Sequence, residues 1–334
     1  MRIFPATTIS RRDALYSIFG AASATALSTS GSLATTWPVP QITITVPFPA
    51  GGTVDQLARL VQPGLQQRLG AAIVIENRPG AQGSLGAAQV AKAAPDGSNW
   101  LFVFDTHAVN PALQKLPFDT KTDLDPVLLI GTSPHVIVTH PGRPWRTFQD
   151  VIAAAKKEPG KLTYGSIGTG SLGHLTMVLL TKRAGIELTH VPYRGGGPLL
   201  NDTLGGHVDF SIASSALFNT QIGSNAVIPI LQTGTERAGS AQKTPTAIES
   251  GYTGFESYAW WGVFAPKATP DTLTKRMRDA IIETLKEPIA QKQITETMQI
   301  TPKFGGPDLL RTWLNAQMSL WGAVVTDNNI KAGQ

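Results

Sequence analysis

Three glycine-rich segments of the sequence carry the groups best suited to binding an anion. They read FPAGGTVD at 48–55, SIGTGSLGH at 166–174 and PYRGGGP at 192–198. Each lies between a segment with the pattern of a strand and a segment with the pattern of a helix. The first N–H groups of a helix lack partners within it and carry partial positive charge, so they can bind a carboxylate or a phosphate. We therefore expect an oxyanion site where these segments meet.

The second segment supplies the hydroxyls of Ser166, Thr169 and Ser171 as well as a helix N-terminus. It also contains the pattern GxGxxG, which occurs in dinucleotide-binding folds. That interpretation needs an acidic residue near the end of the next strand, and the chain has HVPY at 190–193 instead. We expect no dinucleotide and no other cofactor.

The first and third segments each have a simpler interpretation. The first would be a plain turn between strand and helix, in which Thr53 and Asp55 serve only the helix end. In the third, Arg194 would point into solvent, as charged residues in loops usually do. If Arg194 instead faces a ligand, it can pair with a carboxylate, and Tyr193 can pack against the body of that ligand.

The residues of common hydrolases and metalloenzymes are absent or wrongly spaced. The string TGSLG around Ser171 is one residue short of GxSxG, and no histidine follows His207 to complete a triad in that order. The chain has no HExxH pattern and no cysteine, so we expect no metal site. A serine hydrolase using Ser171 with His174 is an alternative, but an N-cap serine spends its hydroxyl on the helix. We expect a binding protein and not an enzyme.

Composition narrows the class further. The chain has 334 residues, of which 42% are hydrophobic and 15% are charged, as is typical of a globular protein. A net charge of +5 spread along the chain does not indicate a nucleic-acid surface. We expect no nucleic-acid partner and a monomer.

The first 34 residues have the character of an export signal. Arg11 and Arg12 precede a weakly apolar stretch at 14–26, and Ser32-Leu33-Ala34 fits the small-x-small rule for cleavage. The arginine pair resembles a twin-arginine signal, with an ordinary secretory signal as the alternative. We expect export to the periplasm, with cleavage near Ala34.

The rest of the chain alternates between strand and helix patterns. The first series is strand 41–48, helix 53–69, strand 72–75, helix 84–93 and strand 100–104. The second is strand 135–139, helix 147–156, strand 161–165, helix 171–183, strand 187–192 and helix 198–204. Strands at 208–213, 226–231 and 258–264 and helices at 270–287, 289–298 and 307–327 complete the pattern. Such βαβ series indicate an α/β fold with parallel strands and helices on both faces.

No Gly/Ser-rich or Pro-rich linker separates the two series, so we expect two lobes with the C-terminal part returning to the first. Lobe 1 would comprise 35–135 plus 256–334, and lobe 2 would comprise 136–255. Open α/β sheets bind ligands at the carboxyl ends of their strands, which is where the three glycine-rich segments fall.

Six motifs occur in order between residues 41 and 330: VPFPAGGTVDQLAR, ENRPGAQGSLGA, THAVNPALQKLPFD, KLTYGSIGTGSLGHL, HVPYRGGGPLLNDTLGGHVD and WWGVFAPKATP. In content, order and spacing they resemble the Bug family, the periplasmic solute-binding proteins of tripartite tricarboxylate transporters. The resemblance implies a type II periplasmic-binding-protein fold, or Venus flytrap, whose two lobes are each a sheet flanked by helices. It also implies delivery of a small carboxylate to a large and a small membrane subunit.

The resemblance further implies which residues contact the ligand. In that family, loops corresponding to 48–55 and 166–174 grip a carboxylate through backbone amides, hydroxyls and ordered waters. The loop at 106–107 and the segment after residue 209 shape the far end of the pocket. The candidate ligand-binding residues are Phe48, Ala50, Gly51, Gly52, Thr53, Asp55, Thr106, His107, Ser166, Gly168, Thr169, Gly170, Ser171, His174, Tyr193, Arg194, Asp209 and Ser214.

The chain departs from the family pattern at two places. Ile167 stands where the family often has a second serine, and Ala213-Ser214 stands where it often has Asp-Asn. Both departures remove polar groups, which favours a carboxylate with an apolar or aromatic body, while a dicarboxylate remains open. A sensory receptor with the same carboxylate-binding fold is an alternative that the sequence does not separate from transport.

Overall fold

The computed structural model describes residues 37–331. The expected export signal at 1–34, including its cleavage near Ala34, lies outside the described residues. Within 37–331, no helix is both long enough and apolar enough to cross a membrane.

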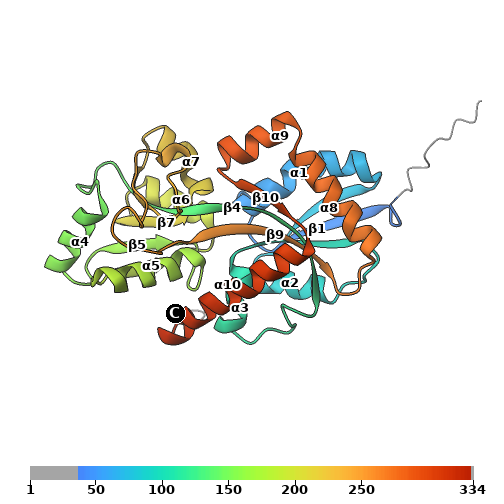
Figure 1. Cartoon of the computed structure of the whole chain (residues 1–334), viewed down its shortest axis with the longest axis horizontal. Helices are drawn as coiled ribbons and strands as arrows, with labels where there is room; N and C mark the ends of the chain where they lie inside the picture. Colours follow the sequence, from blue (N-terminus) through green and yellow to red (C-terminus); the bar gives the residue numbers. More distant parts are fainter. Residues whose placement is uncertain (1–36, 332–334) are drawn as a thin grey trace, which may run out of the picture. The chain divides into compact units, whose positions relative to one another are not determined.

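The elements follow one another in nearly the predicted order (Figure 1). The first part of the chain forms β1 (Gln41–Val46), α1 (Thr53–Leu69), β2 (Ala72–Asn77), α2 (Ser84–Ala91), β3 (Asn99–Phe104), α3 (Thr106–Leu113) and β4 (Leu124–Thr139). The middle part forms α4 (Phe148–Lys157), β5 (Thr163–Ser166), α5 (Leu172–Ala184), β6 (Thr189–Pro192), α6 (Gly196–Leu204), β7 (Phe210–Ser214), α7 (Ser215–Gly223) and β8 (Ile228–Gln232). The last part forms β9 (Tyr258–Pro266), α8 (Asp271–Leu285), α9 (Pro288–Lys292), a π-helical turn (Gln293–Thr297), β10 (Thr301–Gly305) and α10 (Pro307–Asp327).

The ten strands of the described range form one hydrogen-bonded set. Its main path runs β2-β1-β3-β9-β4-β7-β5-β6, and β10 and β8 also pair with β4. β1 is parallel to β2 and β3, and β5 is parallel to β6 and β7, as the βαβ pattern predicts. β4 and β9 are antiparallel to their neighbours, because β9 returns from the C-terminal part of the chain and inserts between β3 and β4. The prediction of parallel strands is therefore confirmed within β1 to β3 and within β5 to β7, and β4 and β9 add antiparallel pairs that the patterns do not indicate.

The fold has two lobes, as the family resemblance implies. We call them the β1 half, with β1 to β3, α1 to α3, α8 and α10, and the β5 half, with β5 to β8 and α4 to α7 (Figure 1). β4 and β9 run from one half into the other (Figure 1). β4 pairs with β9 and β10 up to Pro134 and with β7 and β8 from His135 onward, so it belongs to both halves.

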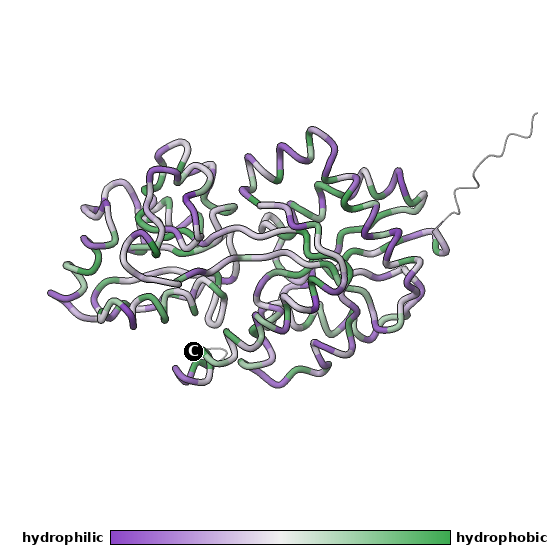
Figure 2. Tube along the Cα trace, in the orientation of Figure 1, coloured by the Kyte–Doolittle hydropathy of each residue, from purple (hydrophilic) through white to green (hydrophobic). Residues whose placement is uncertain are grey.

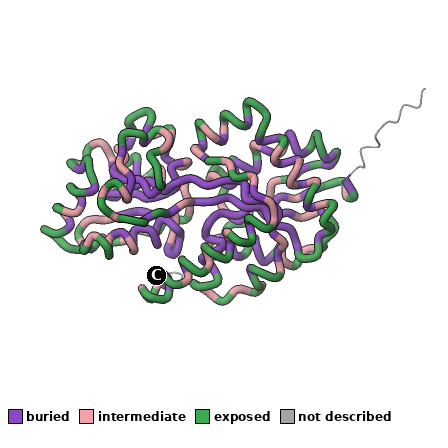
Figure 3. The backbone as a smooth tube through the Cα atoms, in the orientation of Figure 1, coloured by how far each residue is buried: buried purple, intermediate pink, exposed green. Residues whose placement is uncertain are grey.

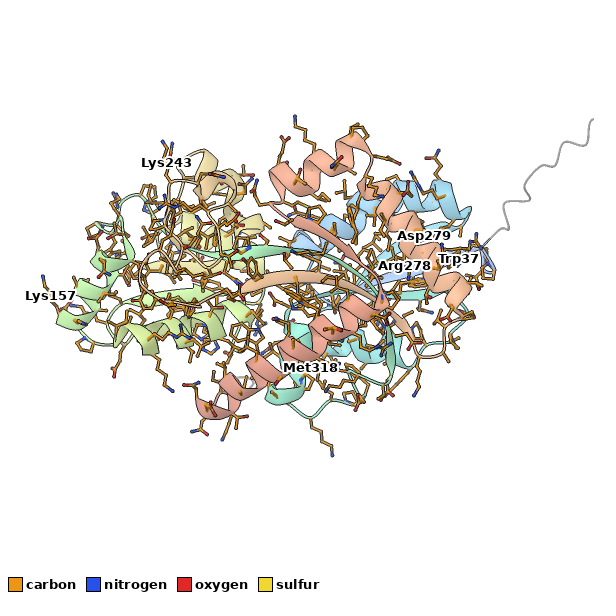
Figure 4. All side chains as sticks on the ribbon, in the orientation of Figure 1. Trp37, Lys157, Lys243, Arg278, Asp279 and Met318 are labelled. Carbon is orange, nitrogen blue, oxygen red and sulfur yellow. The ribbon has the colours of Figure 1, made fainter. Side chains whose placement is uncertain are left out.

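Each half has its own hydrophobic core, formed by the strands and the inward faces of the helices (Figures 2 and 3). Ile42 and Ile44 of β1 are fully buried, and from Ile44 to Val46 the strand is buried on both faces. α1 and α8 approach closely at Gly64, where a Cβ atom would lie 2.4 Å from the side chain of Thr284. Trp37, the first described residue, packs on Trp100 of β3 with ring centroids 6.1 Å apart (Figure 4).

A further apolar cluster joins the two halves. It consists of Val109 of α3, Leu172 and Leu175 of α5, and Trp321, Val324 and Val325 of α10. The last helix of the chain therefore packs against the helix that follows the second glycine-rich segment.

Several elements escape the sequence patterns. β4 begins at Leu124, whereas the pattern predicts a strand only from residue 135. The pattern misses the first part because β4 is buried on both faces and lacks the alternation of a half-exposed strand. Its register also shifts near Pro126 and Gly131. The patterns do not predict α3, α7 or β10, and the helix expected over 289–298 is divided between α9 and the π-helical turn.

Candidate functional site

A cavity of about 600 Å³ lies where β1, β3, β5, β6 and β7 end and the helices after them begin. Residues of both halves line it. They are Pro47, Phe48, Pro49, Ala50, Gly52, Thr53, Val54, residues 79–83, Phe104, Thr106, His135, Ile167, Gly168, Ser171, Gly173, residues 193–198, Ala213, Ser214 and Leu217.

Four helix N-termini converge on this cavity. The N-cap residues of α1, α5, α6 and α7 are Gly52, Ser171, Gly195 and Ser214, and all four line it. The N–H groups of a first helical turn have no partner within the helix, and the helix dipole makes this end partly positive. The arrangement provides donors and positive potential for an anion without requiring several charged side chains.

The charges of the side chains around the cavity are compatible with this positive potential. Among the lining residues, His135, Tyr193 and Arg194 are the ionisable ones, and none is Asp, Glu or Lys. Arg194 is exposed and forms no ion pair with any residue in 37–331. Its guanidinium is therefore available to a carboxylate that enters the cavity.

The lining also contains the apolar side chains of Phe48 and Phe104 from the β1 half and of Ile167 and Leu217 from the β5 half. Phe48 meets Phe104 edge to face with ring centroids 6.3 Å apart, and Phe104 packs on Trp261 at 5.3 Å. A ligand held here can bury an apolar body against these rings while its anionic end faces the helix termini.

In the first glycine-rich segment, the structure separates residues that line the cavity from residues that shape the loop. Phe48, Ala50, Gly52 and Thr53 line the cavity. Asp55 does not, because its carboxylate turns back and accepts a hydrogen bond from the backbone N–H of Gly51 at 3.0 Å.

Two further donors hold the Asp55 carboxylate: Arg59 Nε and Asn77 Nδ2, each at 3.0 Å. Burial alone would raise the pKa of Asp55, but the hydrogen bonds from Arg59, Gly51 and Asn77 together lower it below its usual value. Asp55 is thus ionised at neutral pH, and it fixes the turn that presents Gly52.

In the second segment, Gly168 and Ser171 line the cavity, while Ser166, Gly170 and His174 lie behind them. Ser171 caps α5 by accepting a hydrogen bond from the His174 N–H at 3.3 Å, and it donates to Ser166 Oγ at 3.3 Å. His174 Nδ1 in turn accepts the Gly170 N–H at 3.0 Å. These contacts hold the loop in place. The Ser171 hydroxyl and the His174 imidazole do not bind each other, so they do not form the nucleophile–base pair of a hydrolase.

His174 also stacks on His190 with ring centroids 4.0 Å apart, and His190 Nε2 lies 2.8 Å from Ser166 Oγ. Burial, assisted by the neighbouring His190, lowers the pKa of His174 to about 3, and burial lowers the pKa of His190 to about 4. Both imidazoles are neutral at neutral pH and act as packed, hydrogen-bonded supports.

The remaining candidates divide in the same way. Thr106, Tyr193, Arg194 and Ser214 line the cavity. His107 lies against Phe264, with ring centroids 4.9 Å apart, and does not line it. Thr169 and Asp209 also lie outside the lining.

Asp209 lies at the end of β7 opposite the cavity. Its carboxylate accepts the Thr163 N–H at 2.8 Å and forms an ion pair with Arg143 at 3.1 Å. It therefore joins β7 to β5 at the far end of both strands.

Sequence reasoning misses several parts of the lining, Phe104 and Leu217 among them, and two of these parts bear on the architecture of the site. The first is the loop at 79–83, where Gln82 has a left-handed backbone with φ of 55° and its carbonyl accepts hydrogen bonds from Thr106 and Asn110. Its side-chain amide donates to the Thr169 carbonyl and so connects the β1 half to the β5 half. The glycines of the motif ENRPGAQGSLGA are the signal that marks this loop.

The second missed residue is His135 of β4, whose position in a continuously buried strand hides which face it occupies. Within 37–331, no group of three or more His, Cys, Asp or Glu side chains is placed to hold a metal ion.

Residues 57–330 match a family model described as the Tripartite tricarboxylate transporter family receptor. The chain is 33% identical over 328 residues to the "UPF0065 protein in tcbD-tcbE intergenic region" of Pseudomonas sp. (strain P51), which covers 98% of this chain and 97% of that protein. It is 31% identical to protein BugT of Bordetella pertussis, with 95% of this chain and 98% of BugT covered.

Solved structures show the same fold. The structure described as R. palustris Rpa4515 with adipate has a TM-score of 0.83 and 30% identity, and the match covers 89% of this chain and 99% of that one. MatC (Rpa3494) from Rhodopseudomonas palustris with bound malate has a TM-score of 0.80 and 29% identity, covering 86% of this chain and 99% of that one.

Proposed function

Because the chain belongs to the family of tripartite tricarboxylate transporter receptors, known also as the Bug family, we propose that it is an extracytoplasmic solute-binding protein. It captures a small carboxylate in the cavity and delivers it to the large and small membrane subunits of a tripartite transporter. Residues 1–34 direct the chain to the periplasm and are removed near Ala34.

The observation that carries this proposal is the convergence of four helix N-caps on one cavity that has no acidic side chain in its lining. A carboxylate there receives backbone N–H donors from Gly52 and from the turn after Ser171, with Arg194 adding a positive charge. The three glycine-rich segments act as the carboxylate grip.

The apolar side chains in the lining indicate which carboxylates the cavity prefers. Phe48, Phe104 and Ile167 favour a carboxylate with an aromatic or aliphatic body, and a cavity of about 600 Å³ accommodates a small organic acid. Two relatives of the same fold were solved with the dicarboxylates adipate and malate. The ligand class is therefore an aromatic carboxylate or a dicarboxylate.

Binding draws the two lobes together. We place lobe 1 at 35–135 plus 256–334 and lobe 2 at 136–255, with β4 and β9 as the connection between them. The Gln82 to Thr169 hydrogen bond joins the two halves beside the cavity, and we assign it to the closed arrangement. The chain captures its ligand without chemical conversion, since Ser171 and His174 are both committed to holding their loop.

A thermal-shift screen of the purified protein tests this function. The protein is freed of co-purified ligand by dialysis from denaturant, refolded, and titrated with adipate, malate, succinate, benzoate, glutamate and citrate. A ligand that binds the native state raises the melting temperature in a concentration-dependent way. The methyl ester of the best acid should bind at least about tenfold more weakly, because it cannot accept charge-assisted hydrogen bonds. No shift with any acid, or an ester that binds equally well, would overturn the proposal.

Uptake of the identified acid, labelled with carbon-14, separates transport from sensing. Cells that lack this protein should lose uptake and regain it with the wild-type chain. Normal uptake with a lost transcriptional response would favour the sensory receptor.

A further inference from the structure

His135 is an unusual member of the cavity lining. It lies in β4 at the point where that strand changes partners between the two halves, and its side chain is only 2% exposed. It is the one imidazole in the lining, and sequence reasoning assigns it no role. Its two ring nitrogens face different groups: Nδ1 is 3.2 Å from Ser257 Oγ, and Nε2 is 3.9 Å from Asp105 Oδ2.

A one-way chain of hydrogen bonds determines which nitrogen carries the proton. The Leu172 carbonyl can only accept, so Thr176 uses its single hydroxyl hydrogen to donate to it at 2.6 Å. Ser257 must therefore donate to Thr176 Oγ1, which is 2.7 Å away. With its hydrogen used there, Ser257 Oγ can only accept from His135, so Nδ1 is protonated and Nε2 of the neutral ring keeps its lone pair.

Asp105 does not form a hydrogen bond with Nε2 of His135. Its carboxyl is fully buried, and neither oxygen has a hydrogen-bond partner among the described residues. The 3.9 Å to Nε2 exceeds hydrogen-bond distance. Burial raises the pKa of Asp105 well above its usual value and lowers the pKa of His135 to about 4. His135 is thus neutral near pH 7, and among residues 37–331 its Nε2 is an acceptor without a hydrogen-bond partner.

We propose that Nε2 of His135 is a specificity-determining acceptor that binds a hydroxyl group on the body of the ligand. This inference rests on the proposed function and adds to it: the protein prefers a hydroxylated carboxylate to the same carboxylate without the hydroxyl. A buried acceptor left without a donor loses its hydration with no compensation, so the site disfavours a ligand that brings only apolar surface to Nε2.

Isothermal titration of matched acids tests the preference directly. The probes are benzoate against its 2-, 3- and 4-hydroxy derivatives, succinate against malate, and adipate against 2- and 3-hydroxyadipate. We expect one hydroxyl position on the best-binding scaffold to tighten binding about tenfold, which corresponds to one well-placed hydrogen bond of about 1.4 kcal/mol. If the acids bind but no hydroxyl position improves the affinity, the inference is wrong while the proposed function stands. If no acid binds, both are wrong.

Two substitutions at the same position separate the acceptor from mere packing. His135→Gln places an amide oxygen near Nε2, whereas His135→Asn keeps a donor for Ser257 and removes the acceptor from the cavity. We expect the hydroxyl preference to survive in the Gln variant and to fall to within about twofold of unity in the Asn variant. Equal preferences in both variants would contradict the role of Nε2.

Asp105→Asn and nitrogen NMR provide independent tests of the protonation state. A neutral Asp105 predicts that its Asn variant keeps the hydroxyl preference of the wild type, whereas an ionised Asp105 would hold a proton on Nε2 of the wild type, and the Asn variant would then differ from it in preference. The imidazole nitrogen shifts of His135 at pH 7 should report a protonated Nδ1 and a bare Nε2. The opposite tautomer, or an imidazolium, would overturn the inference without any ligand.

Discussion

The backbone N–H of Gly51 lies 3.0 Å from Oδ2 of Asp55, so the carboxylate in the first turn of α1 closes the loop that precedes the helix. Gly51 has φ of +84°, a conformation that favours glycine, and the turn it makes brings Gly52 to the cavity wall. Asp55, which we expected to contact the ligand, instead holds the loop whose residues line the cavity.

Replacing Asp55 should lower the stability of the folded protein, because its carboxylate holds the loop and does not contact the ligand. Asp55→Asn leaves the Arg59 charge and the Gly51 N–H with weaker partners, and we expect the free energy of unfolding to fall by about 1–3 kcal/mol. Asp271→Asn, an exposed first-turn carboxylate of α8, is the matched control and should change it by less than about 0.5 kcal/mol. Urea unfolding at pH 7 measures both, and equal effects would contradict the assigned role.

The same carboxylate predicts an acid dependence of stability. The pKa of Asp55 is lower in the folded than in the unfolded protein, so its contribution is fully present above the unfolded value of about 4. That contribution is lost as the pH falls through the folded pKa. In urea unfolding between pH 2 and pH 7, Asp55→Asn should therefore differ most from the wild type above pH 4 and converge with it below. A difference that stays constant over the whole range would exclude this linkage.

Gly52 offers a way to block the anion site without disturbing the fold. Its φ is −73°, and a Cβ atom there would meet nothing closer than the Pro49 carbonyl at 3.6 Å. Gly52→Leu should fold normally but extend a side chain over the helix N-terminus and weaken carboxylate binding at least about thirtyfold, or roughly 2 kcal/mol. Gly223→Leu makes the same change at the far end of α7, outside the lining, and should leave the Kd unaltered. Unchanged binding by a folded Gly52→Leu protein would remove this loop from the site.

Arg194 should contribute charge more than shape. Because it is exposed, its effect is screened by salt, and Arg194→Gln should weaken carboxylate binding about three- to tenfold at low ionic strength and less at high salt. Lys157→Gln is the control, since Lys157 lies exposed at the end of α4, far from the lining (Figure 4). Isothermal titration at 20 mM and 500 mM salt measures both variants, and a loss that is independent of salt would argue against a charge contribution.

The hydrogen bond from Gln82 to the Thr169 carbonyl predicts a contribution to the closed state. Gln82→Ala removes this connection between the two halves and should weaken ligand binding by about five- to tenfold, mostly through faster dissociation. Gln114→Ala is the control, because Gln114 contacts the same loop at Ala81 and Ser84 without crossing to the β5 half. Stopped-flow fluorescence gives the dissociation rates, and identical rates for the two variants would mean that Gln82 does not hold the halves together.

The cavity is predictable from sequence where local chemistry positions it. Glycines next to a helix start mark the loops at Gly52, Ser171 and Gly195, and the structure brings these loops to one cavity. The direction of a side chain within a loop is not local, however. Asp55 and His174 turn away from the cavity, and each adds a distant partner, Asn77 and His190 respectively, to the local N–H group that it binds.

The elements that escape prediction depend on long-range pairing. β4 is hard to recognise as a strand because both of its faces are buried and its sequence therefore lacks alternation. Its edges pair with β9 and β10 in one half and with β7 and β8 in the other. His135 belongs to this strand, and its place in the cavity depends on the pairing of β4 with Ser214 of β7. No pattern within a short window contains that information.

The position of β9 also governs the order in which the chain can fold. β3 and β4 are neighbours in sequence, yet the strand that joins them in the sheet comes from residues 258–266. The β1 half therefore lacks the strand between β3 and β4 until most of the chain has been synthesised, and contacts of such large sequence separation slow folding. A fragment that stops before Tyr258 leaves edges of β3 and β4 open, so it should remain a substrate for chaperones rather than an independently folded lobe.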